Sequence, residues 1–211
     1  MAGRFITFEG GEGAGKSTHV RLLAEALRAA GVGVVETREP GGSPGAEQIR
    51  ELLIHGEVAR WDAMTEALLH FAARRDHVTR VVQPALTAGD WVVCDRFADS
   101  TVAYQGFGHG LGPEVIEQLY DITVGALDPD LTVILDLPAD EGLCRAEARK
   151  AGGTRYERMD QAFHQRLREG FLAIAERYPE RCLVVDTSQP IDAVQRSIKE
   201  AVGNRLSVEL P

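Results

Sequence analysis

Cysteine and long apolar runs are scarce in this 211-residue chain. The three cysteines, Cys94, Cys144 and Cys182, are widely spaced and odd in number, which fits neither a disulfide framework nor a zinc site. The chain opens Met-Ala-Gly-Arg without the apolar segment of a secretion signal, and no run reaches the ~20 apolar residues that cross a membrane. These absences predict a cytoplasmic protein without membrane association, with buried thiols at Cys94 and Cys182.

Lysine and net positive charge are also in short supply. Only 3 of the 23 basic residues are lysines, and 32 acidic residues leave a net charge of −9. Wrapping of a nucleic-acid polymer is therefore not expected, because phosphate backbones are bound mainly through Lys and Arg. A small anionic ligand needs only a local positive site. The apolar content of 44% is ordinary for a globular chain, and the length suits a single domain over residues 1–211.

Short, continuous apolar runs alternate with segments long enough for helices. Continuous runs are typical of strands buried on both faces, as in a parallel sheet. We expect one helix over residues 17–30, one that begins at Asp62 as N-cap and runs towards Ala88, and a last one opened by Pro190. The pattern predicts an α/β, doubly wound three-layer fold with a five-stranded parallel sheet. The predicted strands are 5–8, 32–35, 91–94, 131–137 and 182–185.

A glycine-rich segment directly follows the first predicted strand and satisfies the phosphate-loop pattern G-x-x-x-x-G-K-[ST]. Glycines let backbone N–H groups turn inward around phosphate oxygens, and the next helix points its N-terminus at the same anion. Lys16 would neutralise β- and γ-phosphate charge, and the Ser17 hydroxyl would ligate Mg²⁺. The predicted nucleotide-phosphate site spans residues 10–18: Gly10, Gly11, Glu12, Gly13, Ala14, Gly15, Lys16, Ser17 and Thr18.

The rest of the chain narrows the reaction class. GTPase switches carry an N-K-x-D motif that binds guanine and a D-x-x-G switch motif. Neither motif is present, because the only Asn is Asn204 and no Asp has Gly three places on. A small-molecule kinase is the remaining class. Asp95 and Arg96 end the third strand, where ligands bind in such sheets. Asp95 would hold Mg²⁺ through water, and Arg96 would grip phosphate or spread transition-state charge.

Several ordered motifs carry a family resemblance. They are Glu9-Gly10, Arg38-Glu39-Pro40-Gly41-Gly42, the run 68–77, Asp95-Arg96-Phe97, Ser100-Thr101 and Tyr104-Gln105-Gly106. From about Phe5 to Val202 the chain resembles bacterial thymidylate kinases, which are P-loop kinases with a small lid. The resemblance implies transfer of the ATP γ-phosphate to dTMP, with Mg²⁺ as cofactor, to give dTDP for DNA synthesis. It also implies a homodimer.

The resemblance places the dTMP contacts in a helical region of about residues 38–110. Phe71 would stack on thymine, and Arg75, one turn later, would bond a base carbonyl. Arg74 is expected to be a solvated or phosphate-side neighbour. Without the family, a core residue on an apolar helix is the alternative interpretation of Phe71.

Further dTMP contacts follow from the same resemblance. Arg96 would hold the dTMP phosphate with help from Arg38, and Glu12 would lie near the sugar 3′-hydroxyl. Tyr104 would lie under the deoxyribose and crowd C2′. The residues expected to complete the base pocket are Ser100, Thr101 and Gln105.

Basic residues flank a Gly-Gly pair at about residues 143–158 and predict a lid. A solvated helix turn is the alternative interpretation. Because the P-loop has no Arg, the resemblance implies the type with its catalytic arginine in the lid, with Arg149 and Arg155 as candidates and Arg145 stacking on adenine. Two rival functions stay open: another small nucleotide kinase, and a P-loop regulator that turns ATP over poorly.

Overall fold

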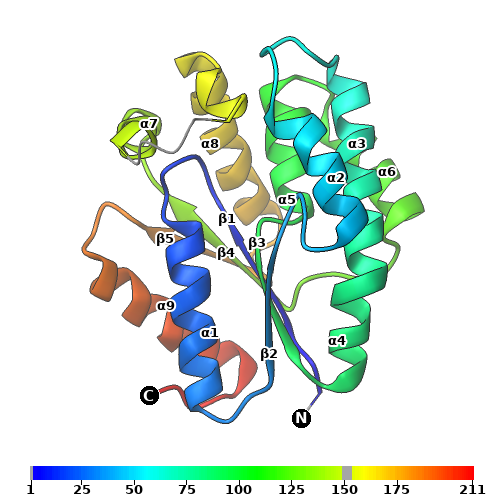
Figure 1. Cartoon of the computed structure of the whole chain (residues 1–211). Coiled ribbons are helices and arrows are strands. Elements are labelled where there is room, and N and C mark those ends of the chain that lie inside the picture. The colour runs from blue at the N-terminus through cyan, green and yellow to red at the C-terminus, as the bar shows by residue number, and fades with distance from the viewer. Residues whose placement is uncertain (1, 149–153) are drawn as a thin grey trace.

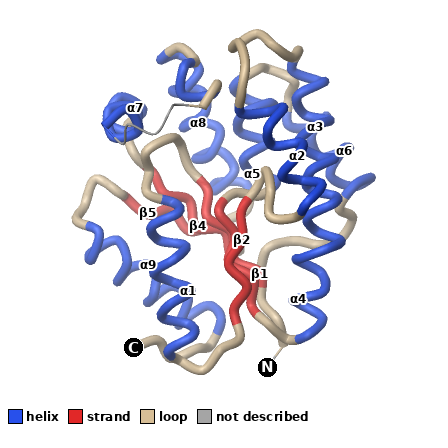
Figure 2. Tube along the Cα trace, viewed as in Figure 1, coloured by secondary structure: helices blue, strands red, loops and turns tan. Residues whose placement is uncertain are grey.

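A five-stranded, all-parallel sheet forms the centre of the protein (Figures 1 and 2). The computed structural model describes residues 2–148 and 154–211. The strand order is β2-β3-β1-β4-β5, which confirms the predicted doubly wound α/β class. The strands are β1 (Phe5–Glu9), β2 (Val34–Arg38), β3 (Trp91–Asp95), β4 (Leu131–Asp136) and β5 (Cys182–Asp186).

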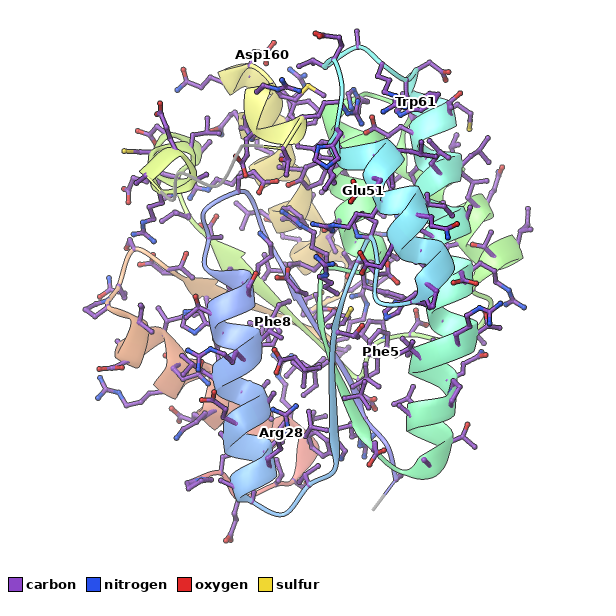
Figure 3. The ribbon with its side chains drawn as sticks, viewed as in Figure 1. Phe5, Phe8, Arg28, Glu51, Trp61 and Asp160 are labelled. Carbon is purple, nitrogen blue, oxygen red and sulfur yellow. The ribbon has the colours of Figure 1, made fainter. Side chains whose placement is uncertain are left out.

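Helices cover both faces of this sheet because its strands carry apolar side chains on both sides. Phe8 packs with the face under α1 (Lys16–Ala29) and α9 (Ile191–Leu206), while Phe5 packs with the opposite cluster (Figure 3). The opposite face is covered by α4 (Gln83–Ala88), α5 (Ala98–Thr101), α6 (Pro113–Thr123) and α8 (Gln161–Arg177).

The helix expected from Asp62 towards Ala88 consists of three segments. The Asp62 side chain accepts from the backbone N–H groups of Met64 and Thr65, so it is the predicted N-cap. The three segments are α3 (Ala63–His77), the π-helical η1 (Val78–Val82) and α4. Pro190 caps α9 as expected.

The remaining elements lie beyond the carboxyl ends of the strands (Figure 1). The elements at this end are α2 (Pro44–Ile54), the upper half of α3, the π-helical η2 (Val102–Gly108), α7 (Ala139–Ala148) and the short η3 (Tyr156–Arg158).

No helix in the described part of the chain is long and apolar enough to cross a membrane.

Candidate functional site

A cavity of about 340 Å³ opens at the carboxyl ends of β1 and β3. Parallel pairing of β1 with β3 sets Phe8 opposite Asp95, so the loops after these two strands lie side by side. The cavity is lined by residues of the P-loop, of the segment 38–40, of α2 and α3 and of the segment from Asp95 to Gln105, and by Thr154, Tyr156 and Glu157. Its position matches the rule that ligands bind outside the carboxyl ends of strands in open α/β sheets.

The P-loop has the backbone that anion binding requires. Gly10, Gly13 and Gly15 have φ of 134°, 70° and 92°, a region open to glycine but costly for other residues. The Lys16 ammonium donates to the carbonyls of Gly10 (3.1 Å) and Gly11 (2.6 Å). Burial and the nearby Arg96 lower the pKa of Lys16 to about 8. An anion bound next to Lys16 would offset both effects, because it would stabilise the charged ammonium.

Ser17 and Asp95 form the site's candidate magnesium ligands. The Ser17 hydroxyl donates to Asp95 Oδ2 at 2.5 Å, across the gap between the P-loop helix and the end of β3. Both are oxygen ligands, as Mg²⁺ prefers, and both line the cavity. The described residues contain no cluster of three or more His, Cys, Asp or Glu that could cage a metal. Two oxygen ligands suit Mg²⁺, which takes most of its other ligands from water and nucleotide phosphates.

Arg96 lies at the junction of the P-loop and the acceptor side. Its backbone is left-handed, with φ of 71°. The guanidinium donates to Gly10 O (3.0 Å), Ser100 Oγ (3.1 Å), Tyr104 Oη (2.9 Å) and Glu12 Oε1 (3.2 Å). Burial alone would raise the pKa of Glu12, but Arg96 and Lys16 lower it to about 2. Glu12 is thus an ionised carboxylate inside the phosphate site.

The structure corrects the predicted base-binding residues by one position along α3. Phe71 is 1% exposed and packs with Ala67 and Ile116, so it belongs to the core, and Arg75 donates to the carbonyl of Thr123 outside the cavity. His70 and Arg74 line the cavity instead. Successive helical residues point about 100° apart, so a shift of one position exchanges the cavity face for the core face.

Arg74 is buried, contrary to the expectation of a solvated neighbour. Its guanidinium donates to Glu39 Oε2 (2.8 Å), the Phe97 carbonyl (3.0 Å) and Thr101 Oγ1 (3.0 Å). Nη1 is buried without a hydrogen-bond partner among residues 2–148 and 154–211. Leaving such a donor unpaired costs free energy, so it is poised for a ligand acceptor.

Two of the three predicted lid arginines, Arg145 and Arg155, lie among the described residues. Arg155 is fully buried and its Nη2 donates to Glu66 Oε2, so the structure contradicts its assignment to the transferring phosphoryl group. The exposed Arg145 on α7 donates to the Thr187 carbonyl at 3.0 Å. Arg149 lies outside the described residues, as do residues 150–153 of the predicted lid.

Four of the five remaining predicted dTMP contacts lie at the cavity. The four are Arg38, Ser100, Tyr104 and Gln105. Thr101 does not line the cavity, but its Oγ1 accepts a hydrogen bond from Arg74, which does. Arg38 also pairs with Glu47 at 2.9 Å.

Sequence reasoning missed several polar residues that shape this site. Glu9 is buried at the end of β1 and accepts from the Phe97 N–H (2.7 Å) and Ser100 Oγ (2.5 Å), and burial raises its pKa to about 8. Its place directly after the predicted strand 5–8 was the available signal. Glu66, His70 and Tyr156 had no such signal, because only tertiary packing brings them together.

Comparison with known proteins places these observations in a family. The family model described as thymidylate kinase matches residues 8–198. The thymidylate kinase of Caulobacter vibrioides is 56% identical over 206 residues, covering 98% of this chain and 99% of that protein. That of Rhizorhabdus wittichii is 51% identical over 207 residues, 98% of this chain and 100% of its own length. The crystal structure of thymidylate kinase from Ehrlichia chaffeensis superposes with a TM-score of 0.79 at 35% identity, covering 96% and 100% of the two chains.

Proposed function

The chain belongs to the thymidylate kinase family, which phosphorylates dTMP to dTDP with ATP, and we propose that the described cavity is where it brings the two nucleotides together. The observation that carries this proposal is the shape of one cavity with two unlike ends. One end is a P-loop with a buried lysine. The other holds a buried arginine with an unpaired N–H group, beside an amide and an imidazole ring.

Thymine binds at the α3 end of the cavity. The unpaired Nη1 of Arg74 donates to a base carbonyl. Gln105, which is fully buried, forms a hydrogen bond with the neighbouring edge of the base. His70 supplies a flat ring for the base. Burial lowers the pKa of His70 to about 4, so the ring is neutral at pH 7 and suits stacking on an uncharged pyrimidine.

The sugar and phosphate of dTMP lie between α3 and the P-loop. Tyr104 packs under the deoxyribose, and Glu12 accepts from the 3′-hydroxyl in place of the Tyr104 hydroxyl that it binds at 2.6 Å. Arg96, helped by Arg38, holds the phosphate. The phosphate is already a dianion near pH 7 and needs no general base to attack the γ-phosphorus of ATP.

Catalysis then rests on alignment and charge neutralisation. Lys16 and Arg96 approach the transferring group from the donor and the acceptor side, which lowers the energy of a transition state with charge spread over phosphoryl oxygens. Mg²⁺, held by Ser17 and by Asp95 through water, would neutralise β- and γ-phosphate charge. Arg149 as the lid arginine, and Arg145 as an adenine contact, stay predictions.

A homodimer is the proposed assembly. Exposed apolar side chains gather on α2, α3 and α6: Leu52 and Met64 are each 38% exposed, Leu68 is 49% exposed and Ile122 is 81% exposed. A second copy of the chain would remove this surface from water. A cytoplasmic location also stays a proposal from the sequence.

A substrate panel tests the proposed activity. ATP with dTMP, dUMP, dCMP, AMP or thymidine should give rapid ADP formation only with a thymine or uracil monophosphate, and dTMP should give the highest kcat/KM. Thymidine should not react, because the nucleophile is a phosphate. ATP consumption without any monophosphate would contradict the proposal and favour a regulatory ATPase.

A further inference from the structure

Glu66 is a buried carboxylate that lines no part of the cavity yet touches a residue that does. Its side chain is 1% exposed, and its Oε1 accepts from Gln105 Nε2 at 2.6 Å. Its Oε2 accepts from Arg155 Nη2, and His109 Nε2 lies 3.4 Å from Oε1. Both oxygens of Glu66 are therefore occupied by groups of the protein.

Glu66 is ionised at neutral pH. Burial alone would raise its pKa, but His109, His70 and Arg155 around it lower the pKa to about 2. An ionised carboxylate can only accept hydrogen bonds. The atom of Gln105 that faces it must therefore be the amide nitrogen, and the hydrogen-bond network alone decides the orientation of this amide.

This orientation turns the amide oxygen of Gln105 away from Glu66. Gln105 lines the cavity, and its Oε1 is buried without a partner among the described residues. An oxygen offers only an acceptor. Thymine and uracil carry a ring N–H beside the carbonyl that Arg74 would bind, whereas cytosine has a bare acceptor nitrogen at that place. An acceptor in the cavity favours the first two bases and repels the third.

We propose that Glu66 is a positioning residue for base selectivity, which holds the Gln105 amide with its oxygen turned to the thymine N–H. The inference rests on the proposed contact between Gln105 and the base. Arg155, assigned by resemblance to phosphoryl transfer, supports this arrangement instead. It neutralises Glu66 and donates to the carbonyls of Leu53 (3.1 Å), in the last turn of α2, and Val58 (2.9 Å), in the loop after α2, which ties the segment before η3 to both.

Glu66→Gln tests the proposal directly. The new carbonyl would keep the bond from Arg155, and the new NH₂ would then face Gln105. Gln105 would turn its oxygen to residue 66 and its nitrogen to the cavity. We expect the ratio of Kd for dCMP to Kd for dTMP, measured by displacement titration, to fall about ten- to a hundredfold.

A purely structural role gives a different result. If Glu66 only neutralises Arg155, Glu66→Gln lowers Tm and weakens both nucleotides alike, and the unchanged ratio overturns the proposal. If Glu66→Gln does not fold, the double variant Glu66→Gln with Arg155→Gln removes both buried charges and carries the same test with the same two outcomes.

Gln105→Leu separates this inference from the proposed function. Loss of dTMP affinity in Gln105→Leu with an unchanged ratio in Glu66→Gln overturns only the positioning role. Unchanged dTMP affinity in Gln105→Leu overturns the base contact itself. Glu57→Gln, an exposed position on the α2–α3 loop, is the matched control and should leave the ratio as in the wild type.

Discussion

Lys16 is buried next to a second cation before any nucleotide binds. Its ammonium is charged below its pKa of about 8 and loses its proton above it. Nucleotide phosphates no longer titrate above about pH 7.5. We therefore expect the Kd for ATP to be constant near pH 7.5 and to rise towards pH 9.5, with proton uptake on binding measurable by calorimetry in buffers of different ionisation enthalpy. A constant Kd and no proton uptake across this range would contradict the assignment.

His70 and Phe71 are neighbours in sequence with opposite surroundings. His70→Ala removes the proposed stacking face from the cavity, so we expect the KM for dTMP to rise at least tenfold while the KM for ATP changes little. Phe71→Ala leaves a hole in the core beside Ala67 and Ile116. We expect it to cost about 3–5 kcal/mol of unfolding free energy.

The two variants control each other, since steady-state kinetics and thermal unfolding are measured on both. If only Phe71→Ala raised the KM for dTMP, with its Tm unchanged, the stacking role would belong to Phe71 and not to His70.

At the scale of elements, α7 packs directly on the P-loop through two glycines. A Cβ built on Gly142 would lie 2.4 Å from the Glu12 carbonyl, and one on Gly13 would lie 2.0 Å from the Gly142 carbonyl. Both distances are too short for real atoms. The close approach of α7 to the phosphate loop therefore depends on the absence of these side chains.

Gly142→Ala should push α7 and the P-loop apart. We expect a rise of about tenfold or more in the KM for ATP, because backbone N–H groups of the loop then miss the phosphate oxygens. The exposed Glu147→Ala on the same helix is the control and should bind ATP as the wild type does. Equal kinetics for the two variants would show that this contact does not shape the donor site.

At the scale of the whole molecule, buried carboxylates link stability to pH. The pKa of both Glu12 and Glu66 is lowered from 4.5 to about 2. In the unfolded chain both take up protons near 4.5, so their stabilising contribution is complete above that pH and is lost as pH falls towards 2. Glu9 has the opposite sign: its raised pKa makes stability fall as pH rises from 4.5 to about 8.

Urea unfolding from pH 3 to pH 6 checks the acid side. The wild type should lose stability steeply below pH 4.5, and Glu66→Gln should show a shallower slope because residue 66 no longer takes up a proton on unfolding. Identical slopes would mean that Glu66 is not held ionised in the folded chain.

The order of strands and helices, the P-loop and the edge that carries Asp95-Arg96 were predictable from sequence. Local rules determine them: continuous apolar runs indicate buried parallel strands, and glycines with one lysine indicate a phosphate loop. The Asp62 cap followed from the same kind of local signal.

Only the tertiary structure decided which face of α3 meets the cavity and where Arg155 lies. Family resemblance assigned Phe71 and Arg75 to the base. A single step along a helix turns a side chain by about 100°, however, and Phe71 packs against Ile116 in the core. The Glu66–Arg155 pair joins positions 89 residues apart. Such a contact is set by how the helices pack, because buried charges must find partners wherever the fold brings them.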